Sequence, residues 1–150
     1  MRYGVAVLPS TRKKARHLLV QALYQWQVSG SDISVIEAEF FADSNMKKVD
    51  VDFFRELLHG IPATVDKLDA AYQPYLDRTQ EGLDPVSRAL LRMGTYELLR
   101  RIDVPYKVAI NEAVNLAKTF GPADSYKYIN GVLDKVAIDS RQVEISAGRR

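Results

Sequence analysis

The apolar residues recur with the 3.6-residue period of an α-helix from about residue 11 to residue 139. In the first periodic segment, residues 11–29, the apolar stripe consists of Ala15, Leu18, Leu19, Ala22, Leu23 and Trp26. Ser10 or Thr11 is the expected N-cap, and Ser29-Gly30 the expected end. Because no segment alternates with period two over the length of a strand, the pattern predicts an all-α fold.

Two more helices are predicted before residue 80. A short one covers residues 32–43, and a longer one starts at the Asp50 cap and runs toward Leu76. Gly60 and Pro62 should kink or divide the longer helix, because proline removes a backbone donor and crowds the preceding turn.

The C-terminal half predicts three further helices. Asp84-Pro85 is a cap followed by a proline at the first helical position, and it predicts the start of a helix over 84–101. Apolar residues lie on most sides of this helix, so we expect it to be largely buried. Pro105 opens the next helix, which should end at Gly121-Pro122 with the glycine in the left-handed conformation. The last helix should start with Asp124 or Ser125 as its cap.

These boundaries divide the 150 residues into three parts. Residues 1–10 are expected to form a flexible extension, residues 11–139 one helical domain, and residues 140–150, which lack periodicity, a frayed basic tail.

Composition narrows the class of protein. The chain is 47% hydrophobic and has no cysteine, which excludes disulfides and thiolate catalysis. No apolar run approaches the roughly 20 residues needed to span a bilayer. The first ten residues do not resemble a secretory signal, so we expect a cytoplasmic protein with no membrane partner.

Catalytic motifs are missing from the sequence. It has no Gly-rich phosphate loop, no histidine–carboxylate cluster at metal-binding spacing and no Ser-His-Asp set. We therefore expect neither an enzyme nor a cofactor or metal site.

The charge is unevenly distributed along the chain. Residues 1–30 carry five cations and no acid, whereas residues 31–60 carry seven acids and three cations, although the net charge of the whole chain is only +2. Such polarity indicates a basic surface that attracts polyanions.

Two groups of residues have the chemistry for binding single-stranded nucleic acid, in which cations contact phosphates and flat rings stack on bases. On the first helix, one face opposite the apolar stripe should carry Lys13, His17, Val20 and Tyr24, with Gln21 at its edge. Around the joint of the last two helices lie Lys118, Phe120, Asp124, Lys127 and Tyr128. Two of these have another interpretation: Tyr24 as a core residue and Asp124 as a simple helix cap.

Four segments closely resemble the NusB family of transcription antitermination factors, in order and in spacing. They are VQALYQWQ at 20–27, DVDFFRELLHG at 50–60, LDPVSRALLRMGTYELL at 83–99 and DVPYKVAINEAVNLAKTFGPADSYKYINGVLDKVA at 103–137. The resemblance implies an all-α fold of two packed three-helix bundles, with about six to seven helices. It also implies binding to the boxA element of nascent ribosomal RNA together with a small-subunit ribosomal protein, NusE, in an antitermination complex with RNA polymerase and other Nus factors.

The resemblance assigns roles by position. The family's arginine-rich N-terminal segment falls on Arg12, Lys13, Lys14 and Arg16. The acid and the aromatic residue of the last helix are Asp124 and Tyr128. Tyr24, Ser87 and Arg88 fall where the ribosomal protein binds, with a neutral serine where some relatives carry an acid. The resemblance leads us to expect monomers among some relatives and homodimers among others, so it allows either state.

Two alternatives belong to other classes of protein. The same helical domain resembles the N-terminal module of ribosomal RNA cytosine methyltransferases, but this chain has neither their catalytic domain nor a cysteine. The other is a non-enzymatic helical interaction protein or dimer with only incidental RNA affinity. Salt-dependent, sequence-selective RNA binding would distinguish it from an antitermination factor.

Overall fold

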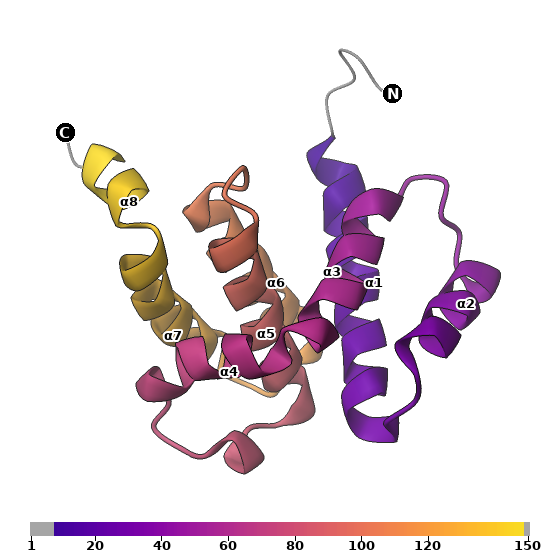
Figure 1. The fold of residues 1–150 in the computed structure, drawn as a ribbon, viewed down its shortest axis with the longest axis horizontal. Coiled ribbons are helices and arrows are strands. Elements are labelled where there is room, and N and C mark those ends of the chain that lie inside the picture. The colour runs from indigo at the N-terminus through magenta and orange to yellow at the C-terminus, as the bar shows by residue number, and fades with distance from the viewer. Residues whose placement is uncertain (1–7, 149–150) are drawn as a thin grey trace. The chain divides into compact units, whose positions relative to one another are not determined.

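The computed structural model describes residues 8–148, which form eight α-helices, two short 3₁₀ turns and no strand (Figure 1). The predicted all-α fold is therefore confirmed. The chain divides into two compact units, residues 1–60 and 61–150, with the boundary inside a helix. Residues 1–7 of the predicted N-terminal extension, and residues 149–150, lie outside the described residues.

The first unit contains α1 (Pro9–Ser29), α2 (Ile33–Asp43) and most of α3 (Val51–Ala63). α1 starts earlier than predicted: Leu8 is the N-cap, and Pro9 occupies the first turn, where its missing N–H costs nothing. The Thr11 hydroxyl donates to the Leu8 carbonyl instead of capping the helix. Phe54, fully buried, contacts Phe40 and Phe41 of α2 and so joins α3 to α2.

The predicted division of the third helix is confirmed. Pro62 lies near the end of α3, which stops at Ala63, and α4 (Val65–Tyr72) starts after Thr64. Two 3₁₀ turns, η1 (Gln73–Tyr75) and η2 (Gln80–Gly82), then lead to α5.

In the second unit α5 (Pro85–Arg100), α6 (Tyr106–Phe120) and α7 (Ser125–Ser140) pack against one another (Figure 1). α5 is the most buried of the three, as its apolar pattern predicts, and Asp84 caps it by accepting from the Ser87 N–H. A Cβ on Gly94 would lie 2.6 Å from Leu133 Cδ1, so this glycine allows α5 to approach α7 closely.

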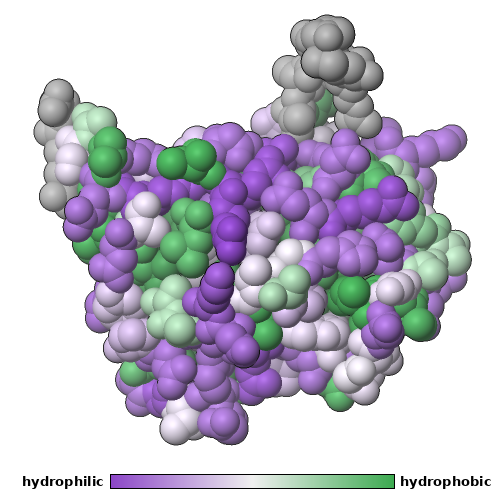
Figure 2. All heavy atoms as spheres, in the orientation of Figure 1, coloured by the Kyte–Doolittle hydropathy of each residue, from purple (hydrophilic) through white to green (hydrophobic). Residues whose placement is uncertain are grey.

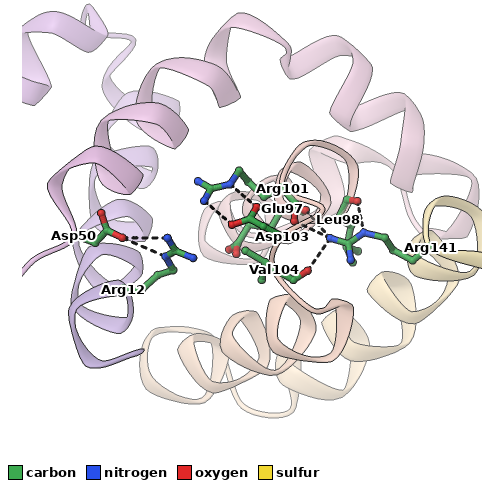
Figure 3. Close-up of polar contacts among 8 residues, drawn as sticks. All are labelled: Arg12, Asp50, Glu97, Leu98, Arg101, Asp103, Val104 and Arg141. Carbon is green, nitrogen blue, oxygen red and sulfur yellow. Dashed lines mark hydrogen bonds and ion pairs between the residues drawn. The ribbon is translucent and has the colours of Figure 1, made fainter. Parts of the chain in front are cut away.

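The C-terminal tail differs from the prediction, because residues 142–148 form a further helix, α8 (Gln142–Gly148). Arg141, at the α7–α8 corner, is 3% exposed and donates to four backbone carbonyls, those of Glu97, Leu98, Arg101 and Val104 (Figure 3). Its guanidinium thus fixes the α5–α6 loop to the start of α8. Sequence periodicity does not detect this, since the contact joins residues about 40 positions apart.

Hydrophilic residues cover most of the face shown in Figure 2, with apolar residues gathered in several places between them. In the second unit, Ile102 and Val143 are 81% and 86% exposed and line a cavity of about 420 Å³ beside α8. The fold leaves this apolar surface uncovered.

Candidate nucleic-acid interface

The basic segment of α1 separates into two kinds of cation. Lys13 and Lys14 are exposed, whereas Arg12 is half-buried and Arg16 is 3% exposed. The arginines are four residues apart and so lie on one side of the helix, the side that packs inside the first unit. Of these four cations, the two lysines are the exposed ones.

Both arginines contact Phe53. The guanidinium carbons of Arg12 and Arg16 lie 4.6 and 5.0 Å from the centre of the Phe53 ring, within cation–π range. Arg12 also pairs with Asp50, whose Oδ2 lies 3.2 Å from Arg12 Nη2 (Figure 3). Asp50 in turn caps α3 by accepting from the Phe53 N–H. These contacts stabilise the first unit, and the buried Arg16 side chain leaves little surface for the predicted phosphate contact.

The outer face of α1 has four of the five expected side chains in solvent. His17, Gln21 and Tyr24 are exposed beside Lys13, with Tyr24 at 43%. Val20 is 2% exposed, so its predicted position on this face is wrong. The buried side of α1 is wider than the apolar stripe predicted from the sequence. We call Lys13, Lys14, His17, Gln21 and Tyr24 the α1 face.

Two residues at the α6–α7 junction have backbone angles that differ from the prediction. Gly121 has φ −87° and ψ 167°, which is extended rather than left-handed. Asp124 is the residue in the left-handed region, with φ 66°. Its carboxylate makes no capping hydrogen bond and lies 3.7 Å from Lys127 Nζ, so the prediction of a side-chain cap is wrong.

Gly121 is needed for close packing. A Cβ there would lie 2.5 Å from Ser125 Oγ and 2.8 Å from the Ala117 carbonyl oxygen. The tight turn that results brings the end of α6 against the start of α7.

This turn gathers cations around an aromatic ring. Lys118 Nζ of α6 and Lys127 Nζ of α7 lie 4.9 and 5.9 Å from the centre of the Tyr126 ring. Asp124 is exposed beside them, and Phe120 is half-buried at the end of α6. We call Lys118, Asp124, Tyr126 and Lys127 the junction face. Tyr126 is absent from the sequence-based set, because projecting α7 alone does not show which of its faces meets Lys118.

Tyr128 lies in different surroundings from Tyr126. The guanidinium carbon of Arg78 is 4.4 Å from the centre of its ring. Burial raises the pKa of the Tyr128 phenol, and the nearby Asp77 and Arg78 act on that pKa in partly opposing senses. The predicted stacking residue is therefore already covered on one side by a cation.

The residues expected to face the ribosomal protein on α5 are engaged inside the second unit. Ser87 is 2% exposed. Arg88 is half-buried, and its Nη2 donates to the carbonyls of Gln80 and Leu83, which holds the η2 turn against α5. A partner would meet little of either side chain, so of the three expected contacts Tyr24 is the accessible one.

Residues 8–148 hold no group of three or more histidine, aspartate or glutamate side chains arranged to bind a metal ion. Nor is any helix in this range both long enough and apolar enough to cross a membrane.

Comparison with known proteins gives a consistent result over nearly the whole chain. The profile of the NusB family matches residues 13–138. A protein of Teredinibacter turnerae named transcription antitermination protein NusB is 56% identical over 95% of this chain and 98% of its own length. The protein of the same name from Yersinia enterocolitica is 54% identical over 86% of this chain and 94% of its own.

Solved structures agree in fold. T. maritima NusB superposes with a TM-score of 0.80 at 28% identity, covering 93% of this chain and 99% of the other. A structure of the antitermination factors NusB and NusE in complex with dsRNA also gives 0.80, at 23% identity, over 88% and 99% of the two chains.

Proposed function

This chain belongs to the NusB family, and from that membership we propose that it is an RNA-binding transcription antitermination factor. It binds the boxA element of nascent ribosomal RNA transcripts together with the ribosomal protein NusE, and so supports processive transcription by RNA polymerase. The observation that carries the proposal is the 56% identity to a transcription antitermination protein over nearly the full length of both chains.

The chemistry of two surfaces supports RNA as the ligand. The α1 face offers Lys13 and Lys14, and the junction face offers Lys118 and Lys127 close to the Tyr126 ring. Lysines contact phosphates as point charges, without the bidentate geometry of arginine, so these contacts hold RNA without reading its sequence. Preference between sequences then depends on Asp124 and the tyrosines, which can accept from base edges and stack on bases.

NusE is the proposed protein partner, and Tyr24 is its proposed contact. An exposed tyrosine on a helix can bury a large ring at small cost in side-chain entropy. Within the same proposal the protein acts in the cytoplasm, in the antitermination complex with RNA polymerase and other Nus factors, and catalyses no reaction. Monomer and homodimer are both compatible with it.

One binding experiment tests the proposal. A boxA-like RNA and a scrambled RNA of equal composition are titrated at one salt concentration, each with and without the ribosomal protein, while sedimentation gives the mass. We expect a preference for the boxA-like RNA that increases when the ribosomal protein is present. Equal affinity for both RNAs under both conditions would favour the alternative, a helical interaction protein whose basic surface is incidental.

A further inference from the structure

A second cavity, of about 460 Å³, opens beside the α6–α7 junction within the second unit. Its lining includes Arg78, Asp84, Asp124, Ser125 and Tyr128. Its volume is within the range of small-molecule sites, about 300–1,000 Å³. The α1 face contributes nothing to this cavity, and neither do Lys118 and Lys127.

Arg78 and Tyr128 form the stacked pair at this cavity. The Arg78 guanidinium lies 4.4 Å from the Tyr128 ring centre, and its side chain is 48% exposed. Asp77 accepts from Arg78 Nε at 2.8 Å and helps to hold the side chain in place. A guanidinium supported on one side by a ring and open on the other is a flat platform, on which a nucleobase can stack.

The charges around the cavity disfavour a phosphate. Asp84 and Asp124 line it together with Arg78, and Asp77 already pairs with that arginine. An anion in the cavity would meet two carboxylates, those of Asp84 and Asp124, and one cation whose charge Asp77 already offsets, which is a net repulsion at short range. A neutral base avoids this cost, and its amino and imino N–H groups can donate to carboxylates.

The walls also have unused hydrogen-bonding capacity. Asp124 is held by its left-handed backbone with its carboxylate in solvent, paired only loosely with Lys127. Within the described part of the chain, the buried Ser125 hydroxyl has no hydrogen-bond partner.

We propose that this cavity receives one unpaired nucleobase of the RNA, which stacks on the Arg78 guanidinium and donates to Asp124. Arg78 is then a base-binding residue, and Tyr128 acts by supporting it. The inference rests on the proposed function and adds Arg78 to the residues that read a base.

The test is Arg78→Lys, which keeps the charge and the partner Asp77 but removes the plane. Its matched control is Arg100→Lys, at an exposed arginine of α5 away from the cavity. Affinity for the boxA-like RNA should fall about tenfold or more in Arg78→Lys, by the value of one lost base stack, while the control stays at the wild-type value. The slope of log affinity against log salt should stay unchanged in both variants, and melting curves confirm folding.

A second readout identifies the base. RNAs carrying 2-aminopurine at single positions should show one position whose fluorescence is quenched by wild-type protein and recovers with Arg78→Lys. If Arg78→Lys binds like wild type while Arg78→Ala flattens the salt slope by about 0.7, Arg78 contacts a phosphate and the inference is overturned. Failure of the proposed function looks different, because wild-type protein would then show no preference between RNAs at all.

Discussion

Two half-buried tyrosines of α7 have different surroundings, and so do two glycines at the end of α6 and inside α7, although no pattern in the sequence distinguishes them. Tyr126 lies among lysines and Tyr128 beside Arg78, although they are only two residues apart on α7. Gly121 has no room for a Cβ, whereas a Cβ on Gly131 would meet nothing within 4 Å. A residue's role here depends on what the turn brings near it.

The glycines give a matched pair of variants. Gly121→Ala places a Cβ 2.8 Å from the Ala117 carbonyl, so we expect a loss of about 1–3 kcal/mol in the free energy of unfolding. Gly131 lies in an open position inside α7, so Gly131→Ala should raise the free energy of unfolding by about 1 kcal/mol, because alanine has the higher helix propensity. Urea denaturation of both variants measures the difference. Equal effects would mean that the junction is not tightly packed.

Tyr24 provides a test of the proposed contact with NusE. Tyr24→Ala should weaken binding of the ribosomal protein about tenfold or more, with melting close to wild type, because a ring that is 43% exposed contributes little to the core. Val28→Ala, at an exposed apolar residue one turn further along α1, is the control and should leave binding unchanged. Unfolding of Tyr24→Ala would instead make Tyr24 a core residue.

At the scale of elements, the sequence predicts helices wherever their signals are local. Asp84-Pro85 marks the start of α5 correctly, since the cap and the first-turn proline act within four residues. α8 is missed because it depends on Arg141, whose partners lie near residue 100. The same distinction applies to the candidate site. The helical period predicts that the lysines are exposed, but the burial of Arg12 and Arg16 depends on their contacts with Phe53 and Asp50, which are distant in the sequence.

The attachment of α8 should depend on pH. Burial raises the pKa of Glu144, but the Tyr106 N–H and the Arg141 guanidinium bind its carboxylate and leave that pKa below its ordinary value of 4.5. Because both partners favour the charged form, the stabilisation is complete above about pH 4.5 and is lost as pH falls through the lowered pKa.

Hydrogen exchange of the amides in residues 142–148 measures this attachment. In wild type their protection should be constant from pH 7 to about pH 5, after correction for intrinsic rates, and should decrease in more acidic solution. Glu144→Gln should show reduced protection at neutral pH and a weaker dependence on pH. Identical protection in wild type and Glu144→Gln would mean that Glu144 does not stabilise the attachment of α8.

At the scale of the whole molecule, residues 1–30 carry an excess of cations and residues 31–60 an excess of acids, and the cations of the first segment differ in exposure. Lys13 and Lys14 are exposed on the α1 face, whereas Arg12 pairs with Asp50. Lys47 and Lys48 are another adjacent, exposed pair, in the α2–α3 loop of the same unit. The two pairs carry equal charge and differ in position, so they separate a local RNA contact from the effect of net charge.

Replacing both Lys13 and Lys14 by alanine should weaken binding of boxA-like and scrambled RNA by the same factor, since phosphate contacts position RNA without reading it. The slope of log affinity against log salt should fall by about 1.4, because each phosphate contact on a single strand releases about 0.7 counterions. The double alanine variant of Lys47 and Lys48 removes the same charge and should keep the wild-type slope. If both double variants flatten the slope equally, RNA responds to the overall charge of the protein and the α1 face is not its binding surface.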